Sequence, residues 1–129
     1  MKSKFSKTWK SSVKPRKQRK YIANAPLHIK AKLLSVNLSK ELRQKHSTRN
    51  VRVKKGDTVR ILRGDFKGSE GKVNDVEVKK LRIFIDGVER SKKDGSKVRI
   101  PFKPSNLQIV SLDLSDVKRK EKLTKSEDK

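Results

Sequence analysis

In KKGDTVRILRGDFKGSEGKV, residues 54–73, glycines, aspartates and β-branched residues recur at regular intervals. Gly56 precedes a run with alternating apolar residues, Gly64 follows that run, and Gly68 and Gly71 lead into the next one. Glycine tolerates positive φ at little steric cost and lets another backbone approach closely. The stretch therefore predicts two strands joined by a tight, glycine-shaped turn.

The glycine spacing is not that of a nucleotide-binding loop. RGDFKGSEGK matches neither GxxxxGK[ST] nor GxGxxG. Such loops also need a following helix whose N-terminus faces the phosphate, and β-branched residues follow here instead. His28 and His46 lie among lysines without a carboxylate cluster, so a phosphate or base contact is favoured over catalysis or metal binding. We therefore expect no enzyme, no metal and no cofactor.

From Val51 onward, the apolar residues recur with a period of two. The short β-rich runs are VRV, TVRIL, GKVNDVEV, LRIFI, KVRIPF and NLQIVSL. The residues expected to share one face of a strand are Val59 and Ile61; Leu81, Ile83 and Ile85; and Val98, Ile100 and Phe102. A parallel sheet would need crossover helices, for which there is no room. The pattern predicts a mainly β fold, a small antiparallel barrel over residues 51–114.

Two segments after the third run extend this plan. In DGVERSKKDGSK, residues 86–97, the pairs Asp86-Gly87 and Asp94-Gly95 are turn signals, so a protruding hairpin is expected. Lys92, Lys93 and Lys97 would lie near its tip. The hairpin is either an ordinary soluble loop or a finger that touches RNA or a neighbouring surface. Residues 115–129 predict a Ser115-capped helix of about two turns with a mixed-charge tail.

Positive charge is concentrated in the first part of the chain. The 129 residues carry a formal net charge of +23, only 31% are apolar, and none is cysteine, which excludes disulfides and thiolate chemistry. Residues 1–50 hold 15 Lys or Arg and one acid, Glu41. Because repulsion among so many unpaired cations destabilises a compact state, a polyanionic partner is expected. No run of roughly 18 apolar residues and no signal-peptide core is present, which favours nucleic acid over a membrane and an intracellular, soluble protein.

Residues 1–50 are thus predicted to form a basic extension. Residues 1–20 should be disordered in the protein alone. They are either a solvated tail or an arm that becomes ordered along phosphates, and the near-absence of acidic residues favours the arm. Phe5 and Trp9 would stack on bases or pack on the domain. One helix is expected over about residues 26–34 behind a possible Asn24 cap, and another from a Ser39 cap to about His46. Removing residues 1–50 is expected to leave the barrel folded and to weaken RNA binding.

The opening stretch resembles a KOW motif, a short element of some ribosomal proteins and transcription elongation factors. The matching residues are Gly56-Asp57, Gly64, Lys67-Gly68 and Gly71-Lys72-Val73. The flanks, residues 24–57 and 95–114, resemble one large-subunit ribosomal protein family in its archaeal and eukaryotic form. The family is numbered twenty-four in the universal and bacterial scheme and twenty-six in eukaryotes. Lys103 stands where that family often has histidine.

The resemblance implies an SH3-like barrel, with the KOW motif at about residues 54–80, that binds the 5′ region of large-subunit ribosomal RNA. It also implies a contribution to early subunit assembly, a place near the nascent-peptide tunnel exit, and a cytoplasmic location within the large subunit. Implied partners are that RNA, neighbouring large-subunit ribosomal proteins and factors at the tunnel exit, with neither membrane insertion nor a homo-oligomer. The alternative is a KOW module of a transcription elongation factor, but a basic arm occupies the place of its expected additional domain.

The RNA contacts implied by position fall in the arm, on the predicted helices and around the KOW turns. They are Arg16, Lys17, Arg19, Lys20, His28, Lys30, Lys32, Lys40, Arg43, Lys45, Arg49, Lys54, Lys55, Arg60, Arg63, Lys67 and Lys72, with Gly56, Gly64, Gly68 and Gly71 shaping the turns.

Overall fold

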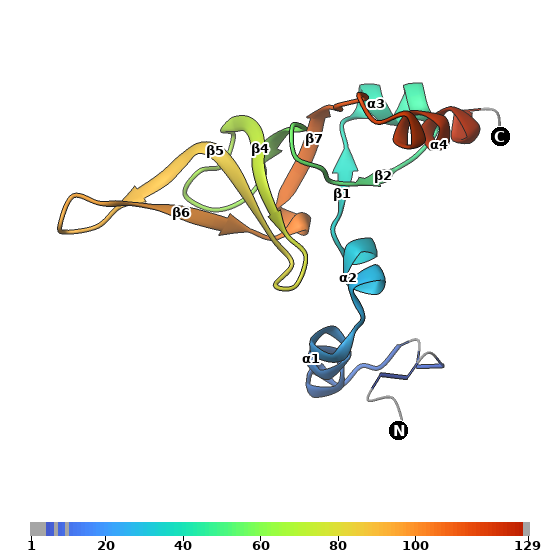
Figure 1. Ribbon diagram of the computed structural model, residues 1–129, viewed down its shortest axis with the longest axis horizontal. Helices are drawn as coiled ribbons and strands as arrows, with labels where there is room; N and C mark the ends of the chain where they lie inside the picture. Colours follow the sequence, from blue (N-terminus) through green and yellow to red (C-terminus); the bar gives the residue numbers. More distant parts are fainter. Residues whose placement is uncertain (1–4, 7, 10, 128–129) are drawn as a thin grey trace.

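The computed structural model describes residues 5–6, 8–9 and 11–127, which form a bent sheet with helices at both ends of the chain (Figure 1). The helices are α1 Pro15–Asn24, α2 Leu27–Leu33, α3 Lys40–His46 and α4 Val117–Glu127. The strands are β1 Ser35–Leu38, β2 Asn50–Arg52, β3 Thr58–Ile61, β4 Glu70–Glu77, β5 Arg82–Ser91, β6 Lys97–Phe102 and β7 Leu107–Ser111. A 3-10 turn, η1 Pro104–Asn106, precedes β7.

The strands follow the order β2-β1-β7-β3-β4-β5-β6. This arrangement confirms a small, mainly β, SH3-like fold. Two details differ from a closed antiparallel barrel. Within the described residues, the sheet ends at β2 and β6 without pairing between them. In addition, β1 and β7 run parallel, with Asn37 opposite Gln108 and Leu38 opposite Ile109. The parallel pair needs no crossover helix of its own because most of the domain lies between these strands in sequence.

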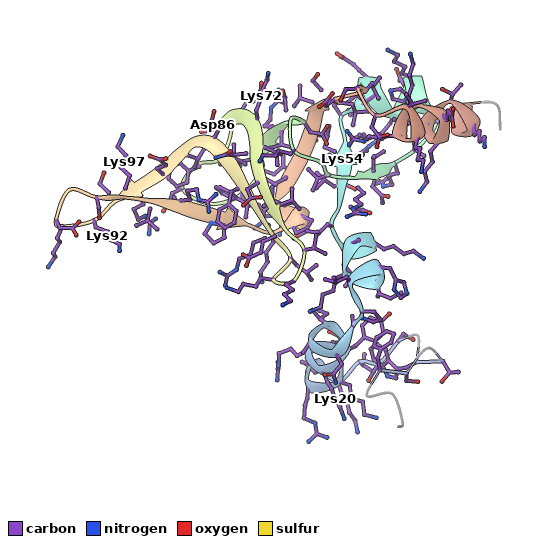
Figure 2. All side chains as sticks on the ribbon, viewed as in Figure 1. Lys20, Lys54, Lys72, Asp86, Lys92 and Lys97 are labelled. Carbon is purple, nitrogen blue, oxygen red and sulfur yellow. The ribbon has the colours of Figure 1, made fainter. Side chains whose placement is uncertain are left out.

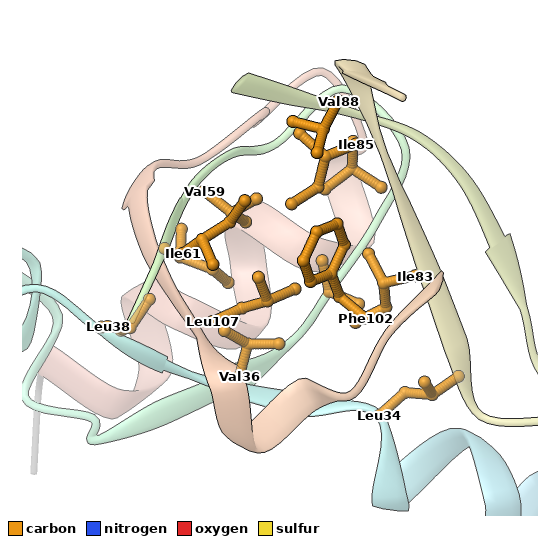
Figure 3. Packing of buried hydrophobic residues seen from close by; sticks show 13 residues of the cluster. Leu34, Val36, Leu38, Val59, Ile61, Ile83, Ile85, Val88, Phe102 and Leu107 are labelled. Carbon is orange, nitrogen blue, oxygen red and sulfur yellow. The ribbon is translucent and has the colours of Figure 1, made fainter. Parts of the chain in front are cut away.

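β1 was not expected from the sequence, and it supplies part of the core. Leu34, Val36 and Leu38 are all fully buried against the strands of the KOW segment (Figure 3). β1 itself is only four residues long and directly follows a helical pattern, so the helical spacing dominates the sequence signal. Because deleting residues 1–50 removes these three core side chains, we now expect that deletion to unfold the sheet, contrary to the expectation from the sequence.

The remaining core comes from the alternating runs. Val59 and Ile61 of β3 are both buried, as their shared face predicts. In β6, by contrast, Phe102 is buried while Val98 is 40% exposed. The outer half of β6 continues into the hairpin beyond the core, so its alternation there faces solvent on both sides.

The protruding hairpin is confirmed as the paired strands β5 and β6, which extend away from the rest of the molecule (Figure 1). At its tip the backbone N–H of Lys92 donates to the carbonyl of Ser96 at 2.8 Å, around the Asp94-Gly95 turn. Asp86-Gly87 is not a turn, contrary to the expectation. It lies inside β5, where the register shifts between Phe84 and Glu89 and Gly87 has a φ of 78°. A glycine in a strand often marks such a bulge.

The two helices expected within residues 24–46 are present as α2 and α3. The Ser39 cap is confirmed, since its hydroxyl accepts the Leu42 N–H at 3.5 Å. Asn24 does not cap α2, because it is the last residue of α1 and Pro26 occupies the cap position instead.

α1 corrects the expectation of disorder for residues 15–20. Pro15 occupies the first helical position, where its missing N–H costs nothing, and helix-forming Lys, Arg and Gln residues follow. Tyr21 then packs against Trp9 and Phe5, with ring centroids 4.6 and 5.0 Å apart. The two aromatics therefore pack on α1. The earliest part of the predicted arm, residues 1–4, 7 and 10, lies outside the described residues.

α4 is longer than expected and begins one residue later. Asp116, not Ser115, caps it, because the Asp116 carboxylate accepts the Lys118 N–H at 3.1 Å. The helix spans 11 residues, and Arg119 and Leu123 on it are buried against the domain. Those tertiary contacts explain why it extends past the two turns that local sequence suggests.

Candidate nucleic-acid interface

The KOW glycines do what their positions predict. The backbone φ is 97° at Gly56, 96° at Gly64 and 88° at Gly68, in the region that L side chains rarely adopt. Gly71 serves close approach instead, because a Cβ there would lie 2.7 Å from Ile85 Cγ2 and 2.9 Å from the Asp86 carbonyl oxygen. The four glycines thus shape the rim of the KOW segment, which runs from the turn before β3 through the β3–β4 turn into β4.

Asp57, the residue after Gly56, is the centre of a buried polar network that sequence reasoning missed. It is fully buried, and its carboxylate accepts the backbone N–H groups of Lys54 and Asp113, each at 2.9 Å. The Arg119 guanidinium of α4 donates to both carboxylate oxygens, at 2.6 and 2.7 Å. It also donates to the carbonyls of Asp113 at 2.9 Å and Arg52 at 3.0 Å. Asp57 therefore fixes the structure and is not available to a ligand.

The predicted cations of the KOW segment divide into two groups. Lys54 is paired with Asp116, whose pKa is lowered chiefly by its hydrogen bond to the Lys54 ammonium. Arg60 donates from Nε to Glu70 at 2.7 Å. The exposed cations without an ion pair in the described part of the chain are Lys55, Arg63, Lys67 and Lys72. This second group offers the rim's uncompensated positive charge.

The four cations predicted on the arm lie on α1, a helix with no buried residue. Arg16, Lys17, Arg19 and Lys20 are all exposed. Lys17 and Lys20 also line a small hollow beside the ring of Tyr21. α1 therefore presents charge to solvent around much of its circumference.

The cations of α2 and α3 are more mixed. Lys30 is half-buried and donates from Nζ to the Lys79 carbonyl at 3.1 Å, which ties α2 to the β4–β5 turn. Arg43 is also half-buried, and the exposed members of the predicted set on these helices and beside them are His28, Lys32, Lys40, Lys45 and Arg49. His46 is only 4% exposed, so the expectation of a phosphate or base contact is wrong for this histidine.

The predicted residues do not converge on one pocket. Figure 2 shows Lys20 on α1 at one end of the molecule, well separated from Lys54 and Lys72 beside the KOW segment. Lys92 and Lys97 lie on the projecting hairpin, in a third direction. An interface made of these cations is extended, which suits a long polyanion better than a small anion.

Within the described residues, no helix combines the length and the apolar character needed to cross a membrane.

The fold and its surface define a class of protein: a small SH3-like β domain with a basic helical extension and a basic rim. The family model that describes the eukaryotic L26 and archaeal L24 ribosomal proteins matches residues 12–126 of this chain. Because the match covers nearly the whole chain, the chain belongs to this family and is a structural constituent of the large ribosomal subunit.

The extent of the match also decides between the two readings of the KOW stretch. It includes α1, α2 and α3 on one side and the segment from β6 to α4 on the other. A KOW motif shared with a transcription elongation factor would not account for those flanks. The family is a structural, non-enzymatic kind of protein.

Proposed function

We propose that the chain binds the 5′ region of large-subunit ribosomal RNA, with α1, α2, α3 and the KOW rim as its contact surfaces. In this proposal it acts early in subunit assembly, lies near the nascent-peptide tunnel exit and works in the cytoplasm as part of the subunit. Its further partners are neighbouring large-subunit ribosomal proteins and factors at the tunnel exit.

The observation that carries this proposal is the distribution of uncompensated charge. Residues 1–50 contain 15 Lys or Arg and one acid, and the four cations of α1 are exposed without burial of any residue on that helix. A helix that buries nothing gains little stability from the domain itself. In the proposed complex, contacts with phosphate neutralise the cations of α1 and hold the helix in place, which the protein alone does not do.

The two surfaces have separate roles in this mechanism. The rim of Lys55, Arg63, Lys67 and Lys72 stands on a rigid sheet, so it sets register against the RNA backbone. The helices of the extension follow neighbouring grooves. Duplex RNA is recognised mainly by shape and by phosphate and 2′-hydroxyl contacts, which such surfaces provide.

Salt dependence of binding to a 5′ fragment of large-subunit RNA tests the proposal. If roughly 10 phosphates are neutralised, log affinity falls with log salt at a slope of about −7 to −9. Replacing Arg16, Lys17 and Lys20 of α1 by alanine should make that slope shallower by about 3, because each removed phosphate contact changes it by about 1. Isothermal or fluorescence titrations at several salt concentrations measure both quantities.

A matched control is available on α4. Replacing Lys118, Lys120 and Lys125 by alanine removes the same charge from exposed positions outside the proposed surface. This variant should retain most of the slope. Equal losses for the two triple variants would show a non-specific charge effect, and equal affinity for duplex DNA of the same length would contradict RNA recognition.

A further inference from the structure

A groove lies where the extension meets the sheet, away from the KOW rim. It has a volume of about 790 Å³, within the range of small-ligand sites. It is lined by α1, the end of α2, β1, the β4–β5 turn with the start of β5, and the segment from β6 to η1. The β4–β5 turn reaches toward α2 (Figure 1), where Lys30 donates to the Lys79 carbonyl at 3.1 Å. That hydrogen bond helps to fix the two walls relative to each other.

The groove combines apolar surface with positive charge. Ile22 and Leu33, which are 41% and 40% exposed, lie in it together with Leu81. The cations lining it are Lys80, Arg82 and Lys103, and no acidic residue is among the side chains that line it. Lys80 is paired with Glu77 at 3.6 Å, but the Lys80 side chain is 62% exposed and solvent weakens the pair, so the groove stays positive.

The remaining lining is polar and placed on the sheet. Asn37 of β1 presents an exposed side-chain amide, which can both donate and accept hydrogen bonds. Leu81 has a φ of 55°, a conformation that is unusual for a bulky residue and often occurs at functional positions. The turn thus holds an apolar side chain at the groove in a strained backbone state.

We propose that this groove binds a single unpaired nucleotide of large-subunit ribosomal RNA. The base packs on Leu33, Leu81 and Ile22, its edge meets the Asn37 amide, and the cations bind the adjoining phosphates. A regular duplex presents phosphate and sugar but no free base face, so it leaves the apolar lining uncovered. The inference rests on the proposed RNA binding and adds to it a position for a bulged or looped-out base.

Two hairpin RNAs that differ by one bulged adenosine test the inference, with the full-length protein at a fixed moderate salt concentration. Because packing the base on Leu33, Leu81 and Ile22 removes apolar surface from water, the bulged hairpin should bind at least about fivefold more tightly. Asn37→Ala should reduce this preference, and Leu33→Asp should abolish it by placing a carboxylate beside the base and phosphate. Both positions are exposed or nearly so, and thermal unfolding verifies that each variant is folded.

Lys92→Ala on the hairpin tip is the matched control, because it removes a cation outside the groove and should leave the preference ratio unchanged. Tight, salt-dependent binding of both hairpins with a ratio near one overturns the groove proposal and leaves the proposed function intact. A ratio that survives both groove variants also overturns it. Failure of the protein to bind either hairpin counts against the proposed function and the groove together.

Discussion

α1 and α4 are both basic helices near the ends of the chain, yet the domain treats them differently. α1 has four Lys or Arg and no acid, and it buries no residue. α4 has five Lys or Arg, but it turns Arg119 and Leu123 into the domain, where they are 8% and 5% exposed. Similar local composition therefore gives one helix that belongs to the folded body and one that projects from it.

The two helices differ because the domain contains a buried acidic residue that pairs with a cation of α4. Asp57 supplies that acid for α4, with its two carboxylate oxygens bonded to the Arg119 guanidinium. α1 holds no buried cation; its Tyr21 packs with Phe5 and Trp9, and its Ile22 lines the groove beside the sheet. One cation of α4, Arg119, therefore stabilises the fold, whereas all four cations of α1 remain available to a ligand.

The largest expected effect is on stability, and it comes from comparing a truncation that removes β1 with one that removes only the residues up to the end of α1. Deleting residues 1–50 should abolish the cooperative unfolding transition, because Leu34, Val36 and Leu38 leave the core with β1. Deleting only residues 1–24 should leave that transition within about 1 kcal/mol of the full-length chain, since α1 contributes no buried side chain. Circular dichroism during chemical denaturation measures both. Two equally folded truncations would contradict the placement of β1 in the core.

A truncation at the other end should give the opposite balance of stability and binding. Deleting residues 117–129 leaves Asp57 buried without its cation and also removes buried Leu123, at a cost of about 3–5 kcal/mol or more. Its RNA affinity, measured at a temperature where it is folded, should stay close to that of the full-length chain. The 1–24 deletion should instead keep its stability and lose affinity. A shared loss of stability in both truncations would remove the contrast between α1 and α4.

The smallest change tests the Asp57 carboxylate, which holds the Arg119 guanidinium and two backbone N–H groups. Asp57→Ala should destabilise the domain by about 3–5 kcal/mol, because it leaves the Arg119 guanidinium buried without a carboxylate. Asp65→Ala is the control: it removes the exposed partner of Arg90, a pair at 3.2 Å that should contribute about 0–1 kcal/mol. Urea denaturation at neutral pH compares the two. Similar midpoints would show that α4 is held by something other than this pair.

The elements that the sequence predicted are those with a local signature. The period-two runs indicated the strands, the Asp94-Gly95 pair indicated the hairpin tip, and Ser39 indicated the start of α3. The four glycines of the KOW segment also behave as their spacing predicted, by positive φ or by close approach. In each case a few adjacent residues contain the whole signal.

The missed features depend on residues that are distant in sequence. Asp57 and Arg119 are 62 positions apart, and nothing near Arg119 distinguishes it from the other cations of its helix. β1 is four residues long and becomes a strand because β7 and β2 pair with it. His46 was interpreted from its basic neighbours, although its burial is set by the fold. For the cationic interface, the sequence identified the positive charges. It did not show that the fold pairs some of them, such as Lys54 and Arg60, with acidic residues.

The parallel pairing of β1 with β7 has a consequence for the order in which the chain folds. β1 begins at Ser35, whereas its partner β7 begins at Leu107. During synthesis the early strand therefore emerges long before the strand on which it packs, and such non-local contacts slow folding. Until β7 arrives, β1 therefore lacks one of its two strand partners, and the sheet cannot be completed.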